Sequence, residues 1–183
     1  MRSFTLTQAA KALRVPQHRL IHLCEEAVVV PEIREAQGRG SRREFSERNL
    51  FEFAIALEMR RLEVPVSFVK AVLHVLLTFE TEVRRNRPDF ILPGSIRAAN
   101  GPHLSLFIVN GEHLYFALGA PKAAQVMLGG VEIPHPSVRG RARRHRPIGR
   151  LRPVDADRML ADARTRTEIN LSAIARDLAT KVE

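Results

Sequence analysis

Two groups of polar side chains near the N-terminus are of the types that bind nucleic acid. The first group lies within residues 17–22 and consists of Gln17, His18, Arg19 and His22. Amide, imidazole and guanidinium groups form hydrogen bonds with base edges. The second group is the GRGSRR stretch at residues 38–43. Its glycines let the backbone approach a ligand closely, and its arginines suit phosphate oxygens. The two patterns predict a base-reading surface beside a phosphate-holding one.

Two short helices are expected to position the first group. Thr5 precedes Gln8 by three residues, which is the spacing of a capping box, and predicts a helix start. A turn over residues 14–16 separates this helix from a second one, in which Leu20, Leu23 and Cys24 face the first helix. The polar residues of the second helix then point outward. This arrangement predicts a helix-turn-helix that fits the major groove.

A two-stranded hairpin is expected to position the second group. Val28–Val30 reads as a strand that Pro31 ends, and Glu44-Phe45 reads as its partner. Gly38 and Gly40 then form the turn, with Arg39, Arg42 and Arg43 near its tip. A hairpin of this composition can also be a solvated turn. After a helix-turn-helix, however, the expected role is to position phosphates.

These stretches resemble a known family. The sequence FTLTQAAKALRVPQHRLIHLCEEAVVVP, then GRGSRREFSERNL, then ALEMRRLEVPVSFVKAVL, within residues 4–76, is similar to the MerR-type DNA-binding domain in its GRGSRR-wing variant. The resemblance implies a winged helix-turn-helix in a transcription regulator that binds double-stranded operator DNA as a homodimer. The DNA-binding residues expected on this basis are Thr5, Gln17, His18, Arg19, His22, Arg39, Ser41, Arg42 and Arg43.

The following residues predict two more helices. Ser46 is placed to cap a helix that begins near Glu47, and Ser67 to cap another after Pro65. The second of these is apolar over a wide arc between residues 68 and 83. Such an arc needs two partners, and the outer one is a second subunit, the C-terminal half of the chain, or the core of a single larger monomer. The helices complete a domain over residues 1–86.

The rest of the chain, residues 87–183, predicts a small antiparallel sheet with C-terminal helices. Two apolar runs flank Asn110-Gly111, which suits a two-residue type I′ hairpin turn. Residues 90–92 and 131–133 are candidate outer strands. A helix is expected over residues 155–164, followed by a short strand that enters a helix within residues 167–182. The predicted fold class is therefore α+β, with a C-terminal domain that dimerises or senses.

Charge is concentrated in one part of the C-terminal domain. The chain has a net charge of +9, and residues 134–153 hold seven arginines and no acid. Prolines and glycines in this stretch predict a loop. The loop is either an arm that follows phosphates or a solvated linker, and the sequence leaves both open.

Several classes of protein are disfavoured by the composition. No apolar run approaches the ~20 residues that span a bilayer, and no secretory signal pattern is present, so a cytoplasmic location is expected. The single Cys24 cannot supply the paired thiolates of a soft-metal sensor. No nucleophile elbow or phosphate-binding loop is present. We expect no enzymatic activity and no cofactor.

Two alternatives to a DNA-binding regulator remain open. One is an antitoxin-like or adaptor-like module whose C-terminal sheet binds a protein partner through a strand edge. The other is a metal-dependent enzyme built on three histidines that fall in or beside the sheet, although their spacing matches no compact ligand motif. These are His103, His113 and His135.

Overall fold

The computed structural model describes residues 2–34, 42–110, 113–119, 126–132, 153–154 and 161–182. Over these residues the chain is α+β, with six helices and two antiparallel sheets. It divides into two compact units, one comprising Met1–Lys70 and Ile174–Glu183 and the other Ala71–Ala173. The domain boundary expected after residue 86 stays a prediction, because compactness does not report which parts fold independently.

The N-terminal unit begins with a short strand and two short helices. Strand β1 (Phe4–Thr5) leads directly into α1 (Leu6–Leu13), and α2 (Gln17–Glu25) follows after three residues. The predicted capping box is confirmed, because Gln8 and Thr5 exchange side-chain and backbone hydrogen bonds at the start of α1. Arg14 ends α1 in the left-handed region at φ 54°.

The expected strand at Val28–Val30 is wrong. These residues follow α2 as a turn, in which the backbone N–H groups of Val28 and Val29 donate to the Leu23 carbonyl. Ala27 has φ 49°, the left-handed conformation that commonly ends a helix. Both valines are buried, so their β-branched side chains pack in the core rather than in a sheet.

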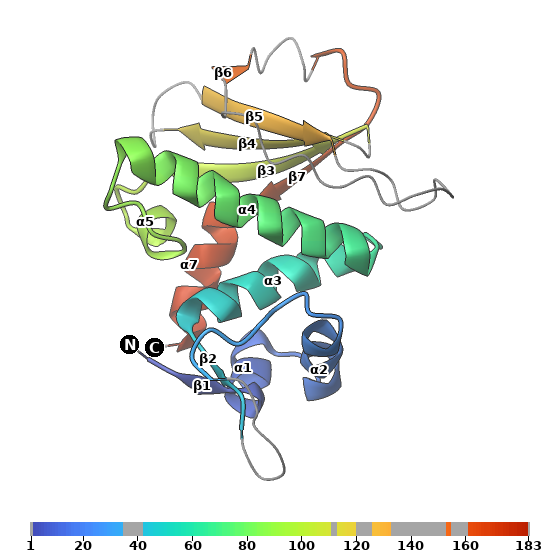
Figure 1. Cartoon of the computed structure of the whole chain (residues 1–183), viewed down its shortest axis with the longest axis vertical. Coiled ribbons are helices and arrows are strands. Elements are labelled where there is room, and N and C mark those ends of the chain that lie inside the picture. The colour runs from blue at the N-terminus through green and yellow to red at the C-terminus, as the bar shows by residue number, and fades with distance from the viewer. Residues whose placement is uncertain are drawn as a thin grey trace. The chain divides into compact units, whose positions relative to one another are not determined.

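Strand β2 (Glu44–Phe45) is confirmed, but its partner is β1, with Phe4 opposite Phe45. Helix α3 (Glu47–Arg61) then begins at the Ser46 cap, as expected. Figure 1 shows α1, α2 and the β1–β2 sheet on one side of α3. The core of this unit includes Leu20, Phe45 and Phe53, all without exposed surface.

Helix α4 (Val66–Asn86) begins one residue before the predicted cap, so Ser67 lies in its first turn. The Pro65 carbonyl accepts from the N–H groups of Phe68 and Val69 and takes the capping position instead. The apolar arc of α4 is largely buried within the single chain, Leu77 being an exception at 43% exposure. The arc therefore does not by itself require a second subunit.

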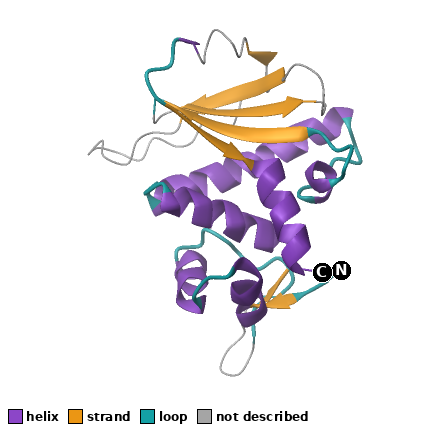
Figure 2. Cartoon of the chain, turned by 180° about the vertical axis from the view of Figure 1, so that it is seen from behind, coloured by secondary structure: helices purple, strands orange, loops and turns teal. Residues whose placement is uncertain are grey.

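The second unit is built on a five-stranded antiparallel sheet in the order β6-β5-β4-β3-β7. Figure 2 shows α4 crossing one face of this sheet. Phe79 of α4 stacks on Phe116 of the sheet, with ring centroids 4.6 Å apart, and Phe90 meets Phe79 edge-on. The strands are β3 (His103–Val109), β4 (His113–Gly119), β5 (Val126–Glu132), β6 (Pro153–Val154) and β7 (Arg166–Asn170).

The predicted hairpin is present, but its register pairs Val109 with His113. Three residues therefore separate the paired positions, where a two-residue turn was expected. Asn110 has φ 53°, and its side-chain oxygen accepts from the backbone N–H groups of Arg164 and Thr165 at 3.0 and 3.2 Å. The turn is thus fixed partly by contacts with the segment before β7.

The outer strand expected at residues 90–92 is wrong. Phe90 and Leu92 are buried and precede the short helix α5 (Gly94–Arg97). The buried Glu80 carboxylate accepts from the Leu92 N–H at 3.0 Å, which satisfies a backbone group that no strand pairs. At the other side of the sheet, the predicted strand residues Val131 and Glu132 do lie in β5.

The predicted strand entering a C-terminal helix is confirmed as β7 and α7 (Leu171–Val182). Asn170 caps α7 by accepting from the Ala173 N–H at 2.8 Å. Of the expected helix at residues 155–164, only residues 161–164 are described. Ala161 is helical but residues 162–164 are not, so the expected end of the helix near Arg164 is wrong. The basic loop at 134–153 lies outside the described residues except for Pro153, which belongs to β6. None of the described helices combines the length and apolar character needed to cross a membrane.

Candidate nucleic-acid interface

Helix α2 presents the polar face expected from the sequence. Gln17, His18, Arg19 and His22 are all exposed, whereas Leu20 and Leu23 of the same helix are 0% and 2% exposed. The buried leucines fix the rotation of α2 about its axis. Gln17, His18 and His22 therefore lie away from the leucines, and Arg19 lies beside Leu23 at the border of the polar face. All four side chains are accessible to a ligand.

One of these side chains is oriented by α1. The Thr7 hydroxyl donates to the side-chain oxygen of Gln17 at 3.2 Å, across the turn between the two helices. This contact leaves the amide nitrogen of Gln17 with two donors for a ligand. Thr5, in contrast, uses its hydroxyl with both the backbone and the side chain of Gln8. In this structure Thr5 is a capping residue.

An antiparallel bridge closes the loop that contains the predicted arginine cluster. The backbone N–H of Glu44 donates to the Arg34 carbonyl at 2.9 Å, and the reverse bond measures 3.2 Å. Arg42 is exposed and Arg43 is half-buried. The side chains of Arg34 and Glu44 also pair at 3.9 Å.

Arg39 and Ser41 lie outside the described residues. Gly38 and Gly40, the expected turn glycines, also lie outside them. The bridge holds the two flanking residues, Arg34 and Glu44, side by side. The predicted strand pairing of this hairpin thus reduces, in the described residues, to the single bridge between Arg34 and Glu44.

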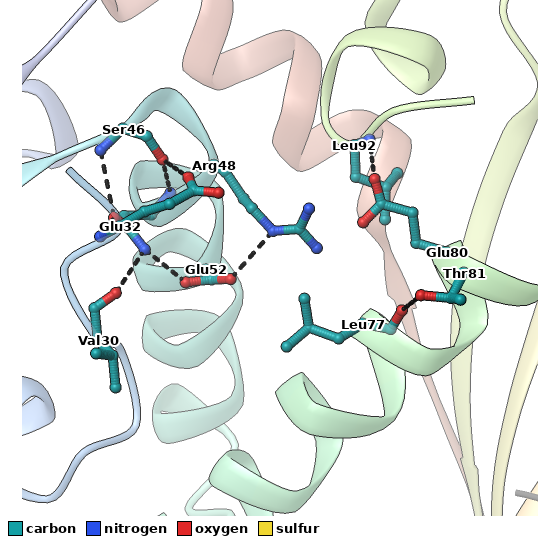
Figure 3. A network of polar contacts seen from close by, with 10 residues as sticks. Val30, Glu32, Ser46, Arg48, Glu52, Leu77, Glu80, Thr81 and Leu92 are labelled. Carbon is teal, nitrogen blue, oxygen red and sulfur yellow. Dashed lines mark hydrogen bonds and ion pairs between the residues drawn. The ribbon is translucent and has the colours of Figure 1, made fainter. Parts of the chain in front are cut away.

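Asn49 anchors the base of the loop, and the sequence reasoning missed it. Its side-chain oxygen accepts from the N–H groups of Glu32 and Ser46 at 2.8 and 3.3 Å. Its side-chain nitrogen donates to the Val30 carbonyl at 3.0 Å and to the Glu52 carboxylate at 2.9 Å. Figure 3 shows this network around the start of α3. The amide makes all four hydrogen bonds open to it.

The same network encloses a charged pair. The Ser46 hydroxyl donates to the Glu32 carboxylate, and the Arg48 guanidinium lies 3.4 Å from the Glu52 carboxylate. Burial raises the pKa of Glu52, and the hydrogen bond from Asn49 and the charge of Arg48 only partly offset that effect. The sequence signal for Asn49 was weak, because a serine followed after three residues by asparagine departs from the usual glutamate or glutamine.

A basic groove beside α1 was also missed. It has a volume of about 570 Å³ and is lined in part by Arg2, Lys11 and Arg14. The guanidinium of Arg2 lies 5.5 Å from the centre of the Phe4 ring, and Lys181 on the groove wall pairs with Asp177. Lys11 in the last turn of α1 and Arg14 at the C-cap of α1 are the sequence signal for this side of the helix.

The described residues contain no cluster of three metal-binding side chains. His103 contacts the Ser105 hydroxyl at 3.1 Å. The side chain of His113 and all of His135 fall outside what the structure describes, so the three-histidine alternative stays untested.

No protein-family model matches the chain, and no curated protein matches it significantly.

Proposed function

We propose that the N-terminal unit is a winged helix-turn-helix domain and that the protein is a MerR-like regulator of transcription. The observation that carries the proposal is the polar face of α2, where Gln17, His18, Arg19 and His22 are exposed together. A short helix with this face, packed against a preceding helix through buried leucines, suits insertion into the major groove of double-stranded DNA.

The roles of the two groups differ in this proposal. His18 and Arg19, with Gln17 and His22, contact base edges and select the sequence. The loop closed by the Arg34–Glu44 bridge is the wing, and its arginines at positions 39, 42 and 43 hold phosphates, with Ser41 as a further contact. Thr5 is left out of the proposed contacts, because both of its donors bond Gln8. A homodimer places two such domains on the two halves of an operator, which explains how one short helix reaches adequate specificity.

The test begins with the selection of bound duplexes from a random DNA library by the full chain. We expect an enriched site with two related halves. In the variant His18→Ala/Arg19→Ala the preference among sequences changes, because lost base contacts cost about 1–3 kcal/mol each and only at the positions they read. Enrichment of no site, or an unchanged preference in this variant, contradicts the proposal.

The wing is tested with Arg42→Ala/Arg43→Ala. Affinity should fall about equally on selected and random duplexes, and the slope of log affinity against log salt should flatten by roughly one to two per chain. The matched control is Arg84→Ala/Arg85→Ala, which removes two adjacent arginines from the end of α4. An equal loss in both variants would show that only net charge matters and would remove the wing from the interface.

A further inference from the structure

Strand β7 ends the five-stranded sheet and is suited to pair with another strand. It pairs with β3 over five residues, from Arg166 opposite Val109 to Asn170 opposite Ser105, without an interruption of register. Within the part of the chain that the structure describes, no strand pairs with its other side. Proteins protect such edges with proline, bulges or charged side chains. Strand β7 has no proline and no bulge, and its charged residues are Arg166 and Glu168.

One hydrogen bond shows which backbone groups of β7 point away from β3. The Asn110 N–H donates to the Thr165 carbonyl at 2.9 Å, so that opposed pair is a hydrogen-bonded one. Hydrogen-bonded and non-hydrogen-bonded pairs alternate along an antiparallel ladder. Thr167 and Ile169 therefore direct their backbone groups toward β3. Arg166, Glu168 and Asn170 direct theirs away from β3, to the side on which the described residues place no strand.

The side chains at the same positions carry opposite charges. Arg166 and Glu168 are two residues apart, so they lie on the same face of the sheet, and both are exposed. One oxygen of the Glu168 carboxylate accepts from the Ser105 hydroxyl at 2.8 Å, which holds this side chain on that face. The edge thus presents a cation and an anion at adjacent outward-facing positions.

We propose that two copies of the chain pair through antiparallel β7 strands about a twofold axis at Thr167. This register sets Arg166 of each copy opposite Glu168 of the other, and both positions direct backbone groups across the edge. A twofold axis at Glu168 or at Arg166 would instead place like charges opposite each other. The two sheets become one continuous sheet, and the pairing supplies the dimer on which the proposed function depends.

The test is a charge exchange measured by sedimentation equilibrium on the full chain without DNA. The wild-type chain should sediment at about 41 kDa, twice the 20.6 kDa of one chain. Arg166→Glu and Glu168→Arg should each weaken the dimer at least tenfold, because like charges then face each other across both pairs. A mixture of the two variants should dimerise again, since every glutamate then opposes an arginine.

The matched control is Arg176→Glu, an exposed charge reversal on α7 that leaves β7 intact. Circular dichroism melts verify that each variant folds. A wild-type chain that is monomeric at tens of micromolar overturns the proposal, as does a mixture that stays monomeric. Because no DNA is present, these outcomes are independent of whether α2 binds an operator. A dimer that both single variants preserve also overturns it and places the interface elsewhere.

Discussion

Helices α1 and α3 begin with the same local motif in different surroundings. Both have a hydroxyl cap and a side-chain amide three residues later, namely Thr5 with Gln8 and Ser46 with Asn49. The first pair lies at the surface. In the second pair, Ser46 is 0% exposed and Asn49 is 2% exposed.

The difference shows that a buried capping box can also bond segments that are far away in the sequence. The hydrogen bonds of Gln8 with Thr5 stay within three residues of chain. Asn49 reaches Glu32 and Val30, which are 17 and 19 residues away. A surface cap organises only its own helix end, whereas the buried one fixes the segment that leads into the Arg34–Glu44 bridge. The side chains of the second box therefore hold the segment before the proposed wing, whereas those of the first box do not reach it.

The largest effect on stability should come from the side-chain amide of Asn49, which with Ser46 forms the buried capping box. Asn49→Ala removes four hydrogen bonds and leaves the partly buried Val30 carbonyl and Glu32 N–H without this partner, so we expect the free energy of unfolding to fall by about 2–4 kcal/mol. Gln8→Ala, the matched change in the exposed box, should cost no more than about 1 kcal/mol because water replaces the amide. Urea unfolding of both variants measures the difference.

DNA affinity and the relative losses of stability distinguish long-range contacts of Asn49 from simple helix capping. Asn49→Ala should also weaken binding to random duplexes, since the base of the proposed wing is no longer held, whereas Gln8→Ala should leave that affinity within about twofold. Equal losses of stability in the two variants would mean that the long-range contacts of Asn49 contribute nothing beyond the cap.

Removal of the two capping hydroxyls should show the same ranking, but with a smaller difference in unfolding free energy. Ser46→Ala removes the cap of α3 and the donor to Glu32, and should cost about 1–2 kcal/mol of unfolding free energy. Thr5→Ala removes a cap at the surface and should cost about 0.5–1 kcal/mol. Thermal melts of the two variants at one pH provide the comparison. A larger loss for Thr5→Ala would contradict the ranking by burial.

Features confined to a few residues of sequence were predictable. The capping box at Thr5 and the helix start at Glu47 follow from side chains that satisfy neighbouring backbone groups. The hairpin around Asn110 follows from two apolar runs on either side of it, although its turn is longer than expected. The errors arose where distant contacts decide the conformation. The valines after α2 and the segment at Phe90 resemble strands in composition. In the structure Val28, Val29, Phe90 and Leu92 are buried, and these segments pair with none of the described strands.

In the candidate site, too, the local features were predictable from the sequence and the long-range contacts were not. The rotation of α2 could be predicted from its leucines, and the exposed polar face followed from it. The role of Asn49 could not be predicted in this way. Its side chain bonds the backbone of Val30, Glu32 and Ser46, and the positions of Val30 and Glu32 depend on how the segment before the bridge folds back. That α2 binds DNA stays a prediction.

The smallest expected effect concerns Glu52, whose carboxylate accepts a hydrogen bond from Asn49 of the buried capping box. Because burial raises the pKa of Glu52, the folded state holds its proton more tightly than the unfolded state does. This contribution to stability is full below the ordinary pKa of 4.5 and is lost as pH rises through the raised value. Glu52→Gln keeps an acceptor for Asn49 and removes the titrating group.

The stability of Glu52→Gln relative to wild type should therefore increase from pH 4 to pH 7.5. Urea unfolding at four or five pH values measures this trend. Glu58→Gln is the matched control, since it removes a carboxylate with an arginine partner from the same helix but from a side chain that is 42% exposed. A relative stability that stays flat or falls with pH would mean that the ion pair with Arg48 outweighs burial at Glu52, and that the buried box tolerates a charge without cost.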